Sequence, residues 1–216
     1  ALYDKCKDYT MTSREKMYAL YKAVQYISTE NIPGDIVECG VWKGGSLMMA
    51  AYTLLAAHDT QRKIYLYDTY TGMVKPTEED VLRSNGIRAL GKWQVKQKEG
   101  YNEWCYASLE EVQDAMSKTG YPQENIKYIK GRVEDTLPGQ SPSAISILRL
   151  DTDWYESTKH ELVHLFPLLS NQGSLILDDY GNWEGSRKAT DEYFKEQYKQ
   201  PLFLSRIDHS GRIGVK

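Results

Sequence analysis

The sequence predicts a single α/β domain built on a mostly parallel sheet, with helices on both faces of the sheet. Short β-branched apolar runs alternate with longer helical patterns, which is typical of parallel strands joined by helices. With 216 residues, 41% of them hydrophobic, the chain can bury one good core but not two. We therefore expect one domain over residues 1–216.

Helical patterns occupy the stretch before the first strand and the stretches between later strands. A capping box predicts where the first helix begins, because Thr12 and Glu15 can satisfy each other's open backbone donors. Ser108 and Glu111 have the same spacing and predict the start of a later helix. The segment up to about residue 33 is expected to form a helical cap. Helices are expected at residues 14–28, 46–57, 109–118, 155–169 and 186–198.

Five apolar runs have the β-branched and aromatic composition of buried strands. They lie at residues 36–39, 64–67, 126–129, 144–150 and 174–177. Near the end of the chain, two alternating pieces at residues 202–207 and 212–215 flank a glycine-containing turn at 208–211. These pieces predict an antiparallel hairpin at one edge of the sheet.

Residues 69–107 break the alternation with a long charged stretch that contains glycine. A connection of this length in a compact domain is usually a functional lid or a disordered segment, and a solvated surface excursion stays open as the simpler interpretation. Four aromatic side chains favour a lid that binds an acceptor, because a merely solvated loop has little use for them. They are Trp93, Tyr101, Trp104 and Tyr106.

Charge and cysteine content exclude several functional classes. The formal net charge of −3 argues against sequence-independent binding of nucleic acid or of an anionic membrane, so small or neutral partners fit better. No run approaches the roughly 18 apolar residues of a membrane span, and the first residues lack a signal peptide's apolar region. Three cysteines without metal-ligand spacing indicate neither a disulfide framework nor a zinc site, so a reducing cytoplasm is expected.

The turn after the first strand is rich in glycine and leads into a helix. In open α/β sheets ligands bind beyond the carboxyl ends of the strands, and glycines there allow close approach of the backbone. The sequence from Gly40 to Ser46 matches neither the Gly-x-Gly-x-x-Gly pattern nor a phosphate loop. Asp68 ends the second strand, where an acid can hold ribose hydroxyls, and Glu134 and Asp135 follow the third. A structural turn and a helix-capping or solvated acid remain the alternatives.

Acidic residues also follow the fourth and fifth strands. If these strands are parallel neighbours, Asp151, Asp178 and Asp179 converge at one edge of the sheet. Carboxylates at such a short separation repel one another unless a cation or a proton lies between them. Oxygen-only ligands favour a hard ion, so we expect a Mg²⁺ site, although helix capping by one pair and solvation of the other would also explain the acids.

Taken in order, these motifs resemble the macrocin O-methyltransferase family of the TylF type, and the resemblance covers nearly the whole chain. Its core is Glu-Cys-Gly-Val-Trp-Lys-Gly-Gly-Ser at 38–46 and Leu-Asp-Thr-Asp-Trp-Tyr-Glu-Ser-Thr at 150–158. The remaining motifs lie at residues 9–13, 34–37, 67–73, 134–138, 178–181 and 185–189. The resemblance implies a Rossmann-like class I methyltransferase fold, S-adenosylmethionine as methyl donor and dependence on Mg²⁺.

The family's site residues carry over to matching positions of this sequence. The resemblance implies donor contacts from Met11, Thr12, Glu38, Gly40, Val41, Trp42, Asp68, Thr69, Gly72, Ser108, Glu134 and Asp135. It implies metal ligation by Asp151, Asp178 and Asp179, with Asp151 also in the position of the general base. Related catechol-type enzymes carry a lysine where this chain has Trp154, so the base is expected to be Asp151 or Asp153.

The resemblance implies methylation of a hydroxyl on a small-molecule acceptor. We expect a sugar hydroxyl in a glycosylated natural product or polysaccharide, with a phenolic natural product as the alternative. Two interpretations from other classes remain: a metal-dependent phosphoester hydrolase that uses the same aspartates, and a scaffold that binds S-adenosylmethionine without consuming it. The resemblance also favours a homo-oligomer.

Overall fold

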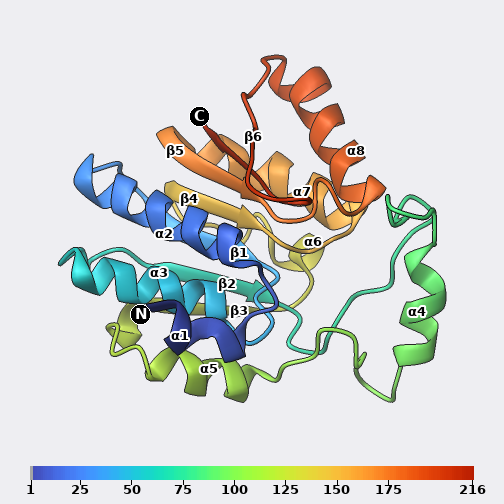
Figure 1. The fold of residues 1–216 in the computed structure, drawn as a ribbon, viewed down its shortest axis with the longest axis horizontal. Coiled ribbons are helices and arrows are strands. Elements are labelled where there is room, and N and C mark those ends of the chain that lie inside the picture. Colours follow the sequence, from blue (N-terminus) through green and yellow to red (C-terminus); the bar gives the residue numbers. More distant parts are fainter. Residues whose placement is uncertain (1) are drawn as a thin grey trace.

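A computed structural model describes residues 2–216 of the chain, so residue 1 of the expected N-terminal cap lies outside the described residues. Its centre is a seven-stranded sheet in the order β3-β2-β1-β4-β5-β7-β6 (Figure 1). The strands β1 to β5 are mutually parallel, whereas β7 pairs antiparallel with both β5 and β6. The strands are β1 Asp35–Cys39, β2 Ile64–Asp68, β3 Ile126–Lys130, β4 Ile145–Leu150, β5 Leu169–Leu177, β6 Ser205–Arg206 and β7 Arg212–Val215.

The strand order reverses between β1 and β4, because the chain first builds outward through β2 and β3 and then returns to the other side of β1. At such a switch point the loops that follow neighbouring strands diverge and leave a crevice for ligands. In the register of β1 with β4, Glu38 lies beside Arg149 and Cys39 beside Leu150. This end of the sheet therefore brings together the loops that the sequence analysis singled out.

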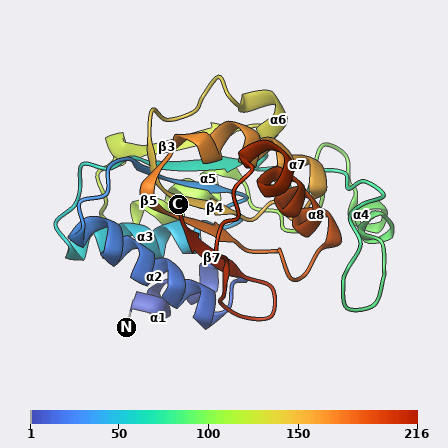
Figure 2. The ribbon, with the colours of Figure 1, turned by 90° about the horizontal axis from the view of Figure 1, so that it is seen from above.

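Helices cover both faces of the sheet, as Figure 2 shows from above. The helices are α1 Leu2–Cys6, α2 Arg14–Thr29, α3 Gly45–Ala56, α4 Ala89–Lys96, α5 Leu109–Ser117, α6 Val133–Thr136, α7 Tyr155–Leu165 and α8 Glu184–Glu192. Helices α1, α2, α3 and α5 pack on one face, and α6, α7 and α8 on the other. Short 3₁₀ turns η1 Lys7–Tyr9, η2 Gln123–Asn125 and η3 Phe166–Leu168 and the π-helix η4 Tyr193–Tyr198 complete the list.

Alternation along the strands divides the core into two layers. Successive side chains of a strand point to opposite faces of the sheet, so Ile36 and Ile147 pack under α2 and α3. Their neighbours Val37 and Leu148 pack on the side of α7. The predicted single α/β domain with a mostly parallel sheet and an antiparallel edge hairpin is confirmed.

The helix boundaries correct one prediction and confirm another. Helix α2 is capped by Ser13, whose hydroxyl accepts a hydrogen bond from the Lys16 amide, so the predicted Thr12–Glu15 box is wrong by one residue. The Thr12 hydroxyl is used elsewhere, as an acceptor for Arg149. The Ser108–Glu111 capping box at the start of α5 is present in both directions.

The segment from 69 to 107 is ordered and includes α4, which stands away from the sheet in both views (Figures 1 and 2). One buried polar residue, Asp80, attaches it to the body of the domain, and a second, Asn102, holds the segment together internally. Asp80 accepts hydrogen bonds from the amides of Thr77 and Tyr155, and a Cβ on Gly185 would lie 2.1 Å from its Oδ1 atom. Asn102 bonds to the backbone of Thr71 through its own amide and to Trp93 through its side chain.

In residues 2–216 every helix is too short or too polar to cross a bilayer.

Candidate active site

A cavity of about 460 Å³ opens at the carboxyl ends of β1, β2, β4 and β5. The loops after all four strands line it, together with the segment before α2 and the inner side of the 69–107 segment. Most residues that the sequence analysis assigned to a site meet here. They are Met11, Thr12, Glu38, Gly40, Val41, Trp42, Asp68, Thr69, Gly72, Glu134, Asp151, Asp153, Asp178 and Asp179.

The loop after β1 has a tight shape that requires glycine. Gly40 has φ +81°, and a Cβ at this position would lie 2.1 Å from the Asp151 carbonyl oxygen. The Asp68 carboxylate holds the loop by accepting hydrogen bonds from the amides of Val41 (2.8 Å) and Trp42 (3.2 Å). Burial raises the pKa of Asp68, while these amide contacts favour its charged form. Asp68 therefore fixes the wall of the cavity as well as facing into it.

The segment before α2 closes one side of the cavity, in agreement with the expected positions of Met11 and Thr12. It packs directly on the first turn of α3, because a Cβ on Gly45 would lie 2.6 Å from the Tyr9 carbonyl. Met11 is 63% exposed although it lines the cavity. An exposed apolar side chain at the mouth of a cavity is well placed to cover a bound molecule.

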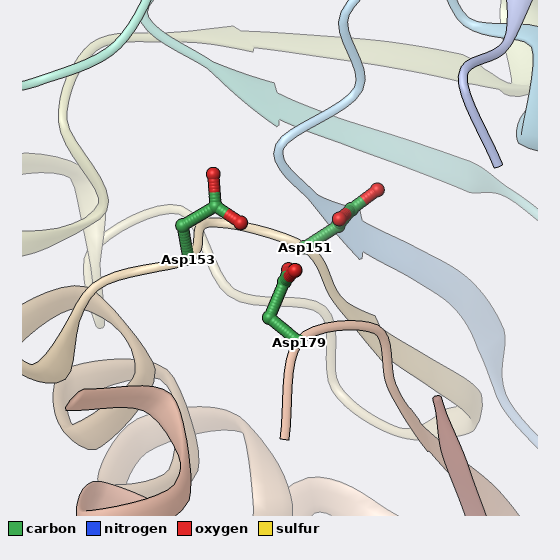
Figure 3. Close-up of side chains that lie close together, drawn as sticks. All are labelled: Asp151, Asp153 and Asp179. Carbon is green, nitrogen blue, oxygen red and sulfur yellow. The ribbon is translucent and has the colours of Figure 1, made fainter. Parts of the chain in front are cut away.

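Three carboxylates converge at the floor of the cavity, as Figure 3 shows for Asp151, Asp153 and Asp179. Each offers one oxygen, and these oxygens lie within 4.8 Å of one another. Desolvation raises the pKa of Asp151 and Asp179 well above the usual range, and that of Asp153 to about 7. The Oδ2 atom of Asp179 is buried and makes no hydrogen bond within residues 2–216. The arrangement suits a cation with a preference for oxygen ligands.

Asp178 lies beside this cluster but its carboxylate is turned to two buried cations. Lys16 Nζ donates to its Oδ2 atom, and Arg149 Nη2 donates to its Oδ1 atom. The three-carboxylate cluster therefore contains Asp153 where the sequence prediction has Asp178. The difference arises because the basic partners come from β4 and α2, and their reach toward Asp178 depends on the packing of the fold.

Sequence reasoning missed Arg149, which is 2% exposed at the centre of the site. Its Nη1 atom donates to Asp151 Oδ2 at 2.7 Å and to Glu38, and its Nη2 atom donates to Thr12 Oγ1 at 3.0 Å. Burial raises the pKa of Glu38 to about 7, against the opposing effect of Arg149. The available signal was one charged residue inside the apolar run of β4, which requires an acidic partner when buried.

Two of the residues expected to contact the donor lie outside the cavity wall. Ser108 uses its hydroxyl and amide in the α5 capping box. Asp135 is exposed on α6, whereas its neighbour Glu134 faces the cavity. The reason is the helical turn of α6, which sends adjacent side chains in different directions.

Part of the cavity wall is aromatic: Trp104 and Trp183 line it, and the buried Trp154 packs against both. Trp104, Trp154 and Trp183 pack edge to face or tilted, with ring centroids 4.9–6.1 Å apart. Lys92 of α4 places its ammonium 3.9 Å from the centroid of the Trp104 ring. Flat apolar surfaces of this kind bind the carbon faces of rings, so the cavity has an acidic floor and an aromatic wall.

Comparison with known proteins assigns this architecture to a family. The family described as Macrocin-O-methyltransferase (TylF) matches residues 5–213. The 8-demethyl-8-(2,3-dimethoxy-alpha-L-rhamnosyl)-tetracenomycin-C 4'-O-methyltransferase of Streptomyces olivaceus is 30% identical over 94% of this chain and 74% of that protein. The demethyldecarbamoylnovobiocin O-methyltransferase of Streptomyces niveus is 31% identical over the same shares of the two chains.

Solved structures agree with the sequence comparison. The structure of the O-methyltransferase NovP superimposes with a TM-score of 0.82 at 28% identity, over 96% of this chain and 82% of that one. The match extends across the sheet, both helical layers and the loops that form the cavity, since it covers nearly all of the chain. On this basis the chain belongs to the macrocin O-methyltransferase (TylF) family and is an O-methyltransferase.

Proposed function

We propose that the protein transfers a methyl group from S-adenosylmethionine to a sugar hydroxyl, with a divalent cation held by the carboxylates on the cavity floor. The observation that carries the proposal is the convergence of Asp151, Asp153 and Asp179 beside a cavity shaped by the loops of β1 and β2. The relative named for a rhamnosyl-bearing tetracenomycin supports a glycosylated acceptor.

The residues of the floor fit a hard divalent ion such as Mg²⁺. Carboxylate oxygens are its preferred protein ligands, and it commonly keeps several waters while using only one or two carboxylates. Asp151 and Asp179 belong both to the expected ligand set and to the observed cluster, and the unpaired Oδ2 atom of Asp179 is available to an ion. A bound divalent ion would supply Lewis acidity, which lowers the pKa of a nearby hydroxyl.

The donor fits the half of the cavity formed by the β1 and β2 loops. Its amino-acid portion would lie against Glu38 and the loop at 40–42, and its ribose against Asp68. A carboxylate offers about four acceptor positions, and Asp68 spends three on the amides of Val41, Trp42 and Tyr70. The Thr69 hydroxyl lies 3.5 Å from Asp68 Oδ1 but 2.8 Å from the Gly72 carbonyl, which takes its single proton, so capacity for a ligand hydroxyl remains. Glu134 would face the adenine at the end of β3.

We assign proton removal from the acceptor hydroxyl to Asp153 in preference to Asp151. Asp151 accepts a hydrogen bond from Arg149 at 2.7 Å, which compensates its charge and weakens it as a base. Asp153 offers one oxygen to the cluster and forms no ion pair with lysine or arginine within the described chain, so its second oxygen can accept the proton as a general base. Its backbone has φ +68°, and Figure 3 shows its carboxylate beside those of Asp151 and Asp179.

The segment at 69–107 would act as the lid that holds the acceptor. Its inner side lines the cavity through Met73, Leu82 and Trp104. An acceptor ring stacked on the aromatic wall would place a hydroxyl near Asp153 and exclude water from the reacting atoms. Such exclusion protects the charged donor and strengthens local electrostatic interactions.

Two measurements test the proposal. Calorimetry should show binding of S-adenosylhomocysteine, and methyl transfer to a panel of deoxysugar glycosides and phenols should stop with EDTA and return with Mg²⁺. Absence of S-adenosylhomocysteine binding would refute the donor assignment. Phosphate release from esters without donor binding would favour a hydrolase, and donor binding without turnover on any acceptor would favour a scaffold.

The third carboxylate ligand is a separate question with its own test. Asp153→Asn and Asp178→Asn can be compared for Mg²⁺ affinity by calorimetry in the presence of S-adenosylhomocysteine. The cluster in the structure predicts the larger loss for Asp153→Asn, and the resemblance predicts it for Asp178→Asn. A loss confined to Asp178→Asn would mean that Asp178 exchanges its contact with Lys16 for the ion.

A further inference from the structure

Arg149 touches both halves of the site. Its guanidinium contacts Glu38 and Thr12, which line the part of the cavity assigned to the donor, and Asp151 and Asp178, which lie at the acidic floor. These partners come from β1, from the segment before α2, and from the loops after β4 and β5. One planar group therefore joins four separate segments of the chain.

The placement follows from the sheet itself. Side chains two residues apart on a strand share a face, so Arg149 points to the same side as Ile147, toward α2. The register pairs it with Glu38, whose side chain shares that face because Ile36 does. Lys16 reaches the same point from α2 and pairs with Asp178. The centre of the link, Arg149 and Glu38, thus lies on neighbouring strands, and Thr12, Asp151 and Asp178 reach it from the adjoining loops.

Charge explains why this link should affect binding. Five acidic side chains gather here around two buried cations, Arg149 and Lys16, so acidic groups outnumber basic ones. The acids are Glu38, Asp151, Asp153, Asp178 and Asp179. The guanidinium contacts both Glu38 and Asp151 and so links the positions of the two carboxylates, and each of the two ligands needs one of them in place. Ordering by the first ligand then reduces the cost of binding the second.

We propose that Arg149 is a positioning residue that couples the donor site to the divalent-cation site, so that each ligand raises the affinity for the other. The inference rests on the proposed function, since it needs both ligands to bind. The two arms of the guanidinium are essential to it: Nη1 donates to Glu38 and Asp151, and Nη2 donates to Thr12 and Asp178. Each arm thus joins a partner in the donor half to one at the acidic floor, and a lysine ammonium does not reproduce this planar geometry. Arg149→Lys keeps the charge and removes this bridge.

Arg62 provides the matched control, because it is also an internal arginine with several fixed partners. Its side chain is 12% exposed and bonds to Asp59 and to the carbonyls of Ile27, Ile32 and Gly34 at the opposite end of the sheet. Arg62→Lys removes comparable hydrogen bonds without touching the cavity. A general loosening of the fold would therefore appear in both variants, and a loss of coupling only in Arg149→Lys.

The experiment is calorimetric titration of Mg²⁺ into the full chain with and without saturating S-adenosylhomocysteine. In the wild type and in Arg62→Lys, we expect S-adenosylhomocysteine to lower the Kd of Mg²⁺ by about fivefold or more, within the usual range of coupling between sites. The reverse titration must give the same factor, since coupling is reciprocal. In Arg149→Lys the factor should fall to near one.

A second variant keeps the proposal testable if Arg149→Lys fails to fold. Glu38→Gln preserves the shape of Arg149's partner and removes its charge, so it should also reduce the coupling factor to near one. An unchanged factor in either folded variant would overturn the proposal, as would independent binding of the two ligands to the wild type. Failure of the wild type to bind S-adenosylhomocysteine would instead overturn the proposed function.

Discussion

The two ends of the sheet each contain an arginine with several fixed partners, partly buried at one end and buried at the other, and they use it in opposite ways. At the amino end, Arg62 pairs with one acid and donates its remaining hydrogen bonds to backbone carbonyls. At the carboxyl end, Arg149 is surrounded by Glu38, Asp151 and Asp178. Unpaired buried oxygens remain there on Glu38 and Asp179.

The difference separates a structural arginine from a functional one. Buried polar groups are normally satisfied, and Arg62 donates to the carbonyls of Ile27, Ile32 and Gly34, of which Ile27 also accepts from the Ile32 amide. The carboxyl end keeps oxygen atoms unpaired and like charges close together, an arrangement that costs stability unless a ligand joins it. We therefore expect substitutions at the amino end to change stability and substitutions at the carboxyl end to change binding and turnover.

Asp179→Asn at the carboxyl end is the strongest test of this comparison. It keeps the volume of the side chain and removes a charge from the cluster that would hold the cation, so methyl transfer should fall by about three orders of magnitude. Calorimetry should show weaker Mg²⁺ binding and nearly unchanged S-adenosylhomocysteine affinity. Equal loss of both affinities would mean that the two halves of the site are not separable.

Arg62→Ala is the corresponding substitution at the amino end. It removes the Arg62 donor from the carbonyls of Ile32 and Gly34 and the ion pair with Asp59, so the free energy of unfolding should fall by about 3 kcal/mol, as judged by urea denaturation. The affinity for S-adenosylhomocysteine should stay within twofold of the wild type. Arg83→Ala is the control, because the exposed pair with Glu184 should contribute well under about 1 kcal/mol. A drop in the affinity of Arg62→Ala for S-adenosylhomocysteine would contradict the division between a structural amino end and a functional carboxyl end of the sheet.

Asp68→Ala tests the wall of the donor half. It removes the acceptor for the Val41 and Trp42 amides as well as the proposed ribose contact, so the Kd of S-adenosylhomocysteine should rise about tenfold or more. Asp135→Ala is the matched control, since this acid is exposed on α6 outside the cavity. If the two variants bind the donor equally well, Asp68 has no part in holding it.

Ser108→Ala should have the smallest effect. The hydroxyl caps α5, so its loss should lower the free energy of unfolding by about 1 kcal/mol and leave the Kd of S-adenosylhomocysteine unchanged. Ser117→Ala near the end of the same helix is the control, because that exposed hydroxyl only donates a hydrogen bond to the Asp114 carbonyl in the last turn. A weaker affinity of Ser108→Ala for S-adenosylhomocysteine would mean that Ser108 contacts the donor, as the resemblance implies.

The residues that follow the parallel strands were the part of the molecule best predicted from the sequence. The apolar runs before Gly40, Asp68 and Asp151 marked parallel strands, and the topology brought the residues after them to one cavity. Spacing alone did not show that Asp178 turns to Lys16, since that contact joins α2 to the loop after β5. The cap of α2 shifted by one residue for a related reason: Thr12 is engaged by Arg149, and Ser13 takes its place.

The attachment of the 69–107 segment has a practical meaning for protein engineering. Asp80 is 0% exposed and accepts the Tyr155 amide, and the Arg83 amide donates to the Asn182 carbonyl, so these two residues hold the segment to the body of the domain. Asn102 bonds to Thr71 and Trp93 and keeps the segment folded on itself, while the acidic floor belongs to the loops at the sheet edge. A graft that exchanges residues 84–101 should retune which molecules are modified without rebuilding the chemistry beneath.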